Sequence, residues 1–373
     1  MRSFTAMDLV ILALGVVVLA FVLDDIFETI IVPRPSPGRH RLSRYVVRPT
    51  WSFWRALGRR VREEGLRRDG FYGIYAPGVF VLLLVVWLLL LVLGYGLILF
   101  ALRGDLKPEP TNLGSALYFA GTSLLTLGYG DIVASGPLAR AVSLVAAATG
   151  LGVVAMVITF LFSIFASFQR RERMVVTLSA RAKAPPSAVT LLEAYARLDL
   201  VDELPVLFAA WEQWSAEVLD SHVAYPILGY FRSSHDNVSW LSALGAVLDA
   251  AALVLTTIKG IPRGQAELTK RGGAHLVEDI GNILGLHGDG AAVDREQFDE
   301  AYRRLERAGY ELEDQERAWR NFERSRRTYA GRLEAMAVYW ATPANAWITE
   351  RHPADSVVHR PAEAVTSAEG HGP

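Results

Sequence analysis

The chain has 373 residues, of which 51% are hydrophobic, and its formal net charge at neutral pH is -1. A charge this close to zero gives no reason to expect a nucleic-acid partner. The absence of cysteine excludes disulfides, thiolate metal sites and cysteine nucleophiles.

Three apolar segments are long enough to span a bilayer, because about 20 residues rising about 1.5 Å each cross its hydrocarbon core. They are residues 7–32, 80–102 and 138–168. The first is too long for the apolar part of a signal peptide, and no small-residue cleavage site follows it. We therefore expect residues 1–33 to form a retained transmembrane helix.

Arginine counts predict the orientation of these helices. Residues 33–70 contain eleven arginines against three acidic residues, whereas only Arg2 precedes the first apolar segment. Three further arginines follow the third segment directly. Because positive charge is retained in the cytoplasm, we expect a multi-pass plasma-membrane protein with its N-terminus outside and its C-terminal part cytoplasmic.

Acidic residues stand near the inner end of the first apolar segment, at Asp24, Asp25 and Glu28. Ionisable residues in a span are typically partnered or functional. Two interpretations are open. The carboxylates pair with arginines of the following linker, or they sense protons or cations.

The basic linker, residues 34–78, contains aromatic and apolar residues at helical spacing. Trp51, Trp54, Leu57 and Val61 share one face of a helix. This pattern favours an interfacial helix on the inner leaflet, with tryptophans at headgroup depth and arginines toward lipid phosphates. A solvated basic loop and a nucleic-acid-binding arm are the alternatives.

The loop between the second and third spans contains a segment too short to cross the membrane. Residues 107–110 read Lys-Pro-Glu-Pro, and residues 111–125 then suit a re-entrant pore helix. The chain that follows a re-entrant helix is non-helical at membrane depth. Non-helical backbone is tolerated there only where it is buried in protein or lines a water-filled path. The negative C-terminal end of this helix would favour a cation.

Residues 123–131 follow as Ser-Leu-Leu-Thr-Leu-Gly-Tyr-Gly-Asp. Gly128 and Gly130 can adopt left-handed dihedrals that alternate with ordinary ones and turn successive carbonyls the same way. Rings of such oxygens replace the water around a dehydrated potassium ion, and Thr126 can add its hydroxyl. The sequence therefore predicts a potassium selectivity filter.

Two other glycine patterns carry no site. Gly94-Tyr95-Gly96 lies within an uninterrupted apolar run and lacks the flanking threonine and aspartate. The run from Gly150 to Ala155 fits a dinucleotide fingerprint only in spacing, because it lies inside a span and no strand precedes it.

Residues 79–169 resemble the two-helix pore unit of bacterial potassium channels, with the TLGYGD filter and an additional transmembrane helix before it. The resemblance implies a homotetramer around one pore and places Asp131 at its outer mouth. It implies a gating hinge at Gly150 and Gly152. The implied potassium ligands are the carbonyls of the filter residues Thr126, Leu127, Gly128 and Tyr129 with the Thr126 hydroxyl, and Gly130 completes the filter.

The same resemblance assigns filter support to the pore helix, at Tyr118, Phe119, Thr122 and Ser123. Three of these positions depart from the family pattern. Tyr118 and Phe119 stand where many relatives have paired tryptophans, and Thr122 stands where some have a carboxylate. The departures concern filter rigidity and inactivation more than potassium preference.

One filter per chain cannot enclose an ion, so four chains are needed. No span carries arginine at every third residue, so a voltage-sensing helix is not expected. No alternation of strands and helices follows residue 168, so a nucleotide-binding regulatory domain is not expected.

Residues 170–352 read as a helical cytoplasmic domain, and residues 353–373 as a disordered tail. Residues 238–258 could pass for a fourth span, but Asp249 at its centre would cost roughly 3 kcal/mol in a bilayer. We therefore assign this segment to a buried cytoplasmic helix.

Polar and aromatic residues of the cytoplasmic domain match no ligand template that would define a site. His222, His235, Asp236 and His275 are expected to be core or solvated residues. The tryptophans Trp211, Trp214 and Trp240 are expected in the core.

Together these features predict an all-α membrane protein with three transmembrane helices, a re-entrant pore helix and filter loop, and a helical cytoplasmic domain. The expected function is passive, potassium-selective conduction, with potassium as the permeant ion, lipid as surroundings, no cofactor and no enzymatic activity. One alternative is a membrane-tethered sensor or enzyme acting through residues 170–352. Another is a potassium-uptake transporter subunit, although those carry four filter-like loops per chain.

Overall fold

The computed structural model describes residues 5–32, 42–60, 70–182, 184–233, 238–288, 293–342 and 348. Three helices in this part of the chain are long and apolar enough to cross a membrane. They are α1 (Ala6–Ile30), the segment Gly70–Ala101 that contains α4 (Tyr75–Ala101), and α6 (Pro137–Ala182). The expected all-α membrane fold is confirmed, while the predicted tail at 353–373 lies outside the described residues.

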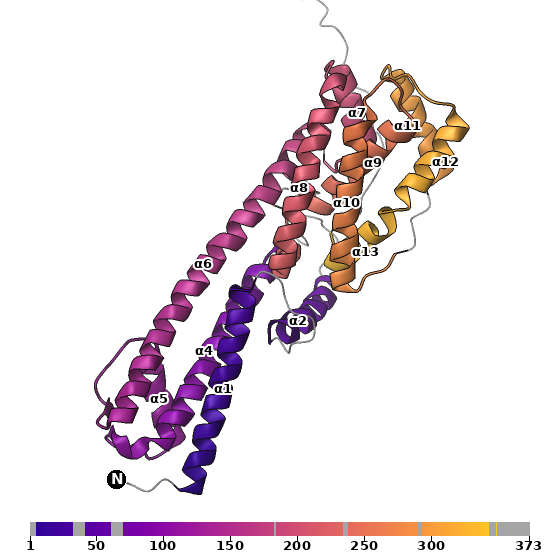
Figure 1. Cartoon of the computed structure of the whole chain (residues 1–373). Coiled ribbons are helices and arrows are strands. Elements are labelled where there is room, and N and C mark those ends of the chain that lie inside the picture. The colour runs from indigo at the N-terminus through magenta and orange to yellow at the C-terminus, as the bar shows by residue number, and fades with distance from the viewer. Residues whose placement is uncertain are drawn as a thin grey trace, which may run out of the picture.

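Helix α1 packs along α4 (Figure 1). Its first turn is closed by a capping box between Thr5 and Asp8, and Arg103 pairs with the Asp8 carboxylate at 2.6 Å. The two helices approach closely at glycines, because a Cβ on Gly15 would lie 2.8 Å from the Gly94 carbonyl oxygen. Gly94 therefore serves helix packing, as expected for a glycine in a membrane helix.

The short helix α5 (Leu113–Leu124) lies between α4 and α6 (Figure 1). It begins at Asn112, whose side chain accepts a hydrogen bond from the Ser115 backbone N–H. This N-cap satisfies one of the free donors of the first turn. The predicted pore helix is thus present, two residues shorter at its start and one at its end.

Helix α6 is longer than the predicted span. It has 46 residues, or roughly 69 Å at about 1.5 Å per residue, and it continues past Phe168 into the C-terminal helical bundle. The expected boundary between residues 169 and 170 therefore lies inside one continuous helix. Figure 1 shows α6 running from the level of α5 to the far end of the bundle.

The C-terminal helical bundle surrounds α9 (Trp240–Thr256), whose residues from Trp240 to Val254 are all buried. Asp249 has 0% exposure and accepts hydrogen bonds from Arg326 Nε at 3.1 Å and from the Tyr329 hydroxyl at 2.7 Å. These partners explain how a carboxylate is accommodated inside the protein. The assignment of this segment to a buried helix is confirmed. The other bundle helices are α7 (Ala188–Arg197), α8 (Leu204–Ala224), α10 (Arg263–Leu284), α11 (Arg295–Arg307), α12 (Gln315–Arg326) and α13 (Ala330–Trp340).

Helix α2 (Leu42–Gly58) confirms a helix in the basic linker, but its expected tryptophan environment is wrong. Trp51 is 2% exposed, and its ring lies 4.8 Å from Tyr75 and 5.2 Å from Tyr230. Its indole N–H donates to the Tyr339 carbonyl oxygen at 3.0 Å. Trp51 therefore anchors α2 to protein on both sides and is not available to lipid headgroups.

Candidate ion-binding site

The loop after α5 has an alternating backbone. Thr126, Gly128 and Gly130 have φ values of 57°, 58° and 81°, and the residues between them are not in the positive-φ region. This is the backbone alternation that the predicted filter requires. The left-handed conformation predicted for both glycines is confirmed.

Thr126 shares this conformation, which the sequence did not indicate, because a β-branched residue rarely adopts positive φ. Such a backbone costs on the order of 1–3 kcal/mol and persists only where its surroundings impose it. Here the Thr126 hydroxyl donates to the Leu125 carbonyl oxygen at 2.7 Å. The strain falls at the first residue of the predicted filter.

The C-terminal turn of α5 holds the beginning of the loop. The backbone N–H of Leu127 donates to the Thr122 carbonyl oxygen at 2.8 Å, and that of Thr126 donates to the Ser123 carbonyl oxygen at 3.1 Å. Thr122 and Ser123 thus support the loop through backbone oxygens. The Thr122 hydroxyl instead donates to the Phe119 carbonyl oxygen at 3.0 Å.

The two aromatic residues expected to support the filter have different surroundings. Phe119 is buried in the cluster that joins α4, α5 and α6. Tyr118 is exposed and lies near the Asp131 carboxylate, which follows the predicted filter. Tyr118 is therefore the pore-helix side chain that reaches the carboxyl end of the loop.

A small antiparallel ribbon ties the two sides of the loop together, and the sequence did not indicate it. Strands β1 (Leu106–Lys107) and β2 (Val133–Ala134) pair before α5 and after the filter. The Ser135 backbone N–H and hydroxyl both donate to the Asp105 carbonyl oxygen, at 2.8 and 2.9 Å. Strands of two residues are too short for any periodic pattern.

Gly150 has a packing role that differs from the expected hinge. A Cβ at this position would lie 1.8 Å from the Leu124 carbonyl oxygen, so only glycine lets α6 approach the end of α5. Gly152 faces open space, with nothing within 4 Å of the corresponding point. Both glycines lie within the continuous helix α6, and a hinge at either remains a prediction.

The N-terminal part of α4 and the middle of α6 are joined by aromatic side chains, to which the bundle also contributes. Phe80 of α4 lies 5.9 Å from Phe160 of α6, which in turn lies 5.5 Å from Tyr225 after α8. Leu228, in the short 3-10 helix η3 (Pro226–Tyr230), is buried in the same cluster. The bundle thus contacts both helices that flank α5.

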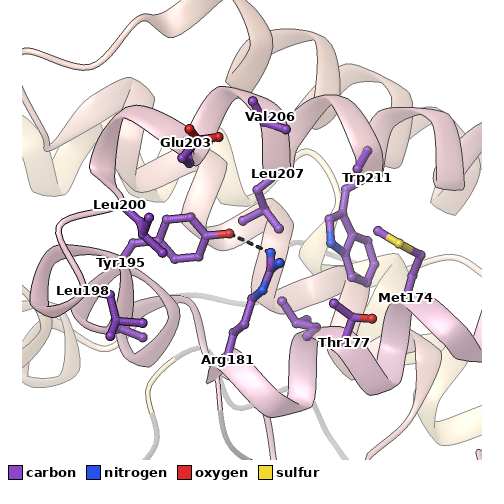
Figure 2. A pocket seen from close by; sticks show the side chains of 13 residues that line it. Met174, Thr177, Arg181, Tyr195, Leu198, Leu200, Glu203, Val206, Leu207 and Trp211 are labelled. Atoms are coloured by element: carbon purple, nitrogen blue, oxygen red, sulfur yellow. Dashed lines mark hydrogen bonds between the residues drawn. The ribbon is translucent and has the colours of Figure 1, made fainter.

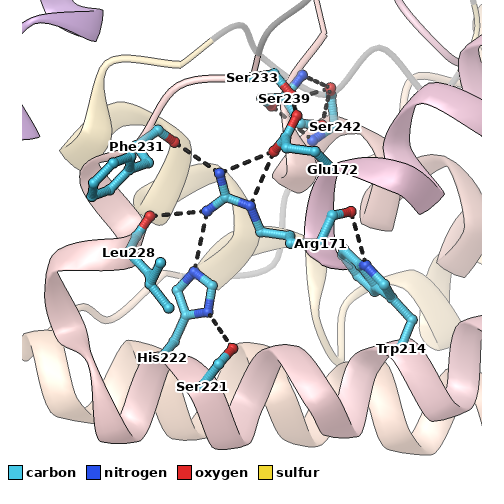
Figure 3. Close-up of polar contacts among 10 residues, drawn as sticks. All are labelled: Arg171, Glu172, Trp214, Ser221, His222, Leu228, Phe231, Ser233, Ser239 and Ser242. Atoms are coloured by element: carbon cyan, nitrogen blue, oxygen red, sulfur yellow. Dashed lines mark hydrogen bonds and ion pairs between the residues drawn. The ribbon is translucent and has the colours of Figure 1, made fainter. Parts of the chain in front are cut away.

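Further along α6, a buried arginine binds this helix to the bundle (Figure 3). The Arg171 guanidinium donates to Glu172 Oε1 and to the carbonyl oxygens of Leu228 and Phe231, at 2.9 to 3.1 Å. The Arg171 carbonyl oxygen accepts from the Trp214 indole N–H at 3.1 Å. Because an arginine is costly to bury without partners, this set of contacts fixes α6 against the bundle.

His222 completes this cluster as a neutral base. Its Nδ1 lies 2.8 Å from the Val218 carbonyl oxygen, which can only accept, so Nδ1 carries the proton and Nε2 accepts from Arg171. Burial, and then the charge of Arg171, lower the pKa of His222 to about 3. His222 is therefore a core residue, as expected.

The other members of the rejected polar cluster do not join His222. His275 is exposed and lies 3.6 Å from Asp279, while His235 and Asp236 lie outside the described residues. Among the described residues there is no group of three His, Cys, Asp or Glu side chains that could hold a metal. Trp211, Trp214 and Trp240 are buried, as predicted.

The three acidic residues of α1 have different surroundings. Asp25 and Glu28 are buried, whereas Asp24 is exposed. The Asp25 carboxylate accepts from the Trp87 indole N–H at 2.7 Å, which joins α1 to α4 near their inner ends. A buried acceptor for Trp87 is thus one role of this acidic group.

Comparison with known proteins agrees with this geometry. A family model described as an ion channel matches residues 83–167, from within α4 to the end of the membrane part of α6. The uncharacterised membrane protein YdjJ of Bacillus subtilis (strain 168) is 28% identical over 191 residues. The match covers 50% of this chain and 54% of YdjJ, so the chain spans about half the length of that relative. No solved structure shows significant similarity. Residues 83–167 thus match an ion-channel family model, within a chain that has three helices long and apolar enough to cross a membrane in its described part.

Proposed function

We propose that this protein is a potassium-selective channel that conducts K+ passively across the plasma membrane as a homotetramer. The observation that carries the proposal is the alternating backbone of Thr126, Gly128 and Gly130 at the carboxyl end of α5. Aligned carbonyl oxygens replace the hydration shell of potassium.

The proposed ion ligands are the carbonyl oxygens of Thr126, Leu127, Gly128 and Tyr129, with the Thr126 hydroxyl at the inner end. That hydroxyl uses its proton in the bond to Leu125, which leaves its oxygen lone pairs available to a cation. Asp131 stands beside Tyr118 at the outer end and contributes negative charge to the mouth.

Tetramer formation follows from the single filter loop in each chain. The side chains of Leu127 and Tyr129 are 52% and 68% exposed in one chain, although both are large and apolar or aromatic. Neighbouring copies around a four-fold axis would cover them and supply the other three strands of the filter.

The proposed orientation places the filter and N-terminus outside. The beginning of α1 lies at the same end of the molecule as α5, whereas the helical bundle lies at the opposite end (Figure 1). Together with the eleven arginines at positions 33–70, this arrangement supports a cytoplasmic bundle.

Potassium flux through the full chain in liposomes tests the proposal. We expect flux with K+ and little with Na+, and loss of flux in Gly128→Ala, because alanine is strained at φ 58°. Gly264→Ala is the matched control, since Gly264 lies in α10 with open space around it. Equal K+ and Na+ flux, or full flux in Gly128→Ala, would contradict the assignment of the filter.

A further inference from the structure

A cavity of about 360 Å³ lies between the cytoplasmic part of α6, the end of α7 and the beginning of α8 (Figure 2). This size is within the range of small-molecule sites. Most of its lining is apolar, and two of the lining residues, Tyr195 and Trp211, are buried aromatics. The apolar lining residues include Met174, Leu178, Leu198, Leu200, Val206 and Leu207.

One positively charged side chain, that of Arg181, lines this otherwise mostly apolar cavity. Arg181 of α6 is exposed, and its Nη1 donates to the Tyr195 hydroxyl at 2.8 Å. Burial raises the pKa of Tyr195, so this partner stays neutral. Within the described part of the chain no carboxylate lies within 4.0 Å of the Arg181 side-chain nitrogens. A guanidinium has five N–H donors, so most remain available to a planar or tetrahedral anion.

We propose that this cavity binds a water-soluble amphiphilic anion, namely a short alkyl chain carrying a carboxylate or phosphate group. The alkyl chain of the ligand occupies the apolar cavity, and its anionic group binds Arg181 at the mouth of the cavity. Arg181 lies 13 residues beyond Phe168 in one continuous helix, or about 20 Å, so the ligand reaches the site from the cytoplasm rather than from the bilayer.

An occupied cavity would act on α6 in two ways. Met174, Thr177 and Arg181 belong to α6 itself and line the cavity. On the opposite wall, the Trp211 ring lies 4.5 Å from Trp214, whose indole binds the Arg171 carbonyl oxygen. Regulation of the pore by this ligand rests on the proposed channel function, whereas binding itself does not.

Binding is tested by equilibrium dialysis of the purified full chain in lipid nanodiscs, with empty nanodiscs subtracted. The probes are octanoate and octyl phosphate, which distinguish the two head groups. Octyltrimethylammonium tests whether the head group must be negatively charged, and inorganic phosphate tests whether the alkyl chain is needed. We expect saturable binding of at least one octyl anion and none of the cation or of phosphate alone.

Four variants assign the binding to the cavity. Arg181→Gln should weaken it by about 10-fold or more, because a charge-assisted contact is lost. Glu203→Gln should strengthen it, since Glu203 is a like charge at the rim. Ala210→Phe should abolish it, because Ala210 is an exposed wall residue that can be enlarged without entering the core. Arg197→Gln, an exposed arginine at the end of α7, should bind like the wild type.

Absence of saturable binding, equal binding of the cation, or unchanged binding in Ala210→Phe would each overturn the inference. Dissociation of the oligomer in Ala210→Phe, with no binding by the wild type, would assign the hollow to a second copy of the chain instead. Flux separates the two proposals. Selective potassium flux without octyl-anion binding refutes only the ligand site, and binding without any flux refutes only the channel.

Discussion

The carbonyl oxygen of Leu124 lies 1.8 Å from the point where a Cβ on Gly150 would sit. A methyl group there must displace the end of α5 and the loop that follows it. We expect Gly150→Ala to lower thermal stability, at a cost of about 1–3 kcal/mol typical of overpacking, and to reduce conduction. Thermal unfolding and liposome flux measure both effects.

Gly152→Ala separates packing from hinge motion. Because nothing lies within 4 Å of its added methyl, this variant should match or slightly exceed the wild type in stability. If both variants keep wild-type stability and both lose conduction, a hinge accounts for the glycines better than packing does.

Asp25 and Trp87 form a second point of contact between membrane helices, with a distance of 2.7 Å from the indole nitrogen to the carboxylate. We expect Asp25→Ala to destabilise the protein by about 1–3 kcal/mol, because the buried indole N–H of Trp87 loses its acceptor. Asp24→Ala, at the exposed neighbouring position, is the control and should change stability little. Equal effects in the two thermal unfolding curves would refute this ranking.

We expect the same substitution to affect stability very differently at two arginines of α6, Arg171 and Arg173. Arg171→Lys retains charge but loses the guanidinium geometry that reaches two carbonyls and Glu172 at once. We expect a loss of about 1–3 kcal/mol, because lysine leaves buried carbonyl acceptors without a donor. Arg173→Lys, two residues along and exposed, should behave like the wild type. Denaturant unfolding of both variants measures the difference, and a stable Arg171→Lys would show that the network does not hold the bundle.

His222 predicts a pH dependence of stability. Its pKa is about 3 in the folded chain, chiefly through burial, against 6.5 for the ordinary side chain. Between these values the unfolded chain binds a proton that the folded chain does not. Stability should therefore be flat above pH 6.5 and decrease as the pH falls toward 3, by about 1.4 kcal/mol per unit.

A matched pair isolates this contribution. His222→Gln keeps an acceptor for Arg171 and a donor for Val218, and should show a smaller loss of thermal stability between about pH 7 and pH 5 than the wild type. His275→Gln, at an exposed position, should retain the wild-type slope. Identical slopes in all three proteins would exclude His222 as the source.

The elements of the pore region were predictable because each depends on local sequence. Apolar length defines the spans, Asn112 and the prolines before it delimit α5, and only glycine adopts the backbone found at residues 128 and 130 without strain. The predictions that differed from the structure did so because of tertiary contacts. Trp51 has the spacing of an interfacial residue, yet it packs between Tyr75 and Tyr230, and no local pattern encodes partners so distant in the chain.

The amino-acid sequence by itself determined the three apolar helices, the charge asymmetry and the left-handed glycines of the loop after α5, since hydropathy, arginine position and backbone freedom are properties of short segments. Only the tertiary structure decided that α6 continues into the bundle, that Arg171 is buried among carbonyl oxygens, and that Gly150 serves the approach of Leu124. These outcomes depend on which surfaces meet, because burial and close packing are set by residues far apart in the chain.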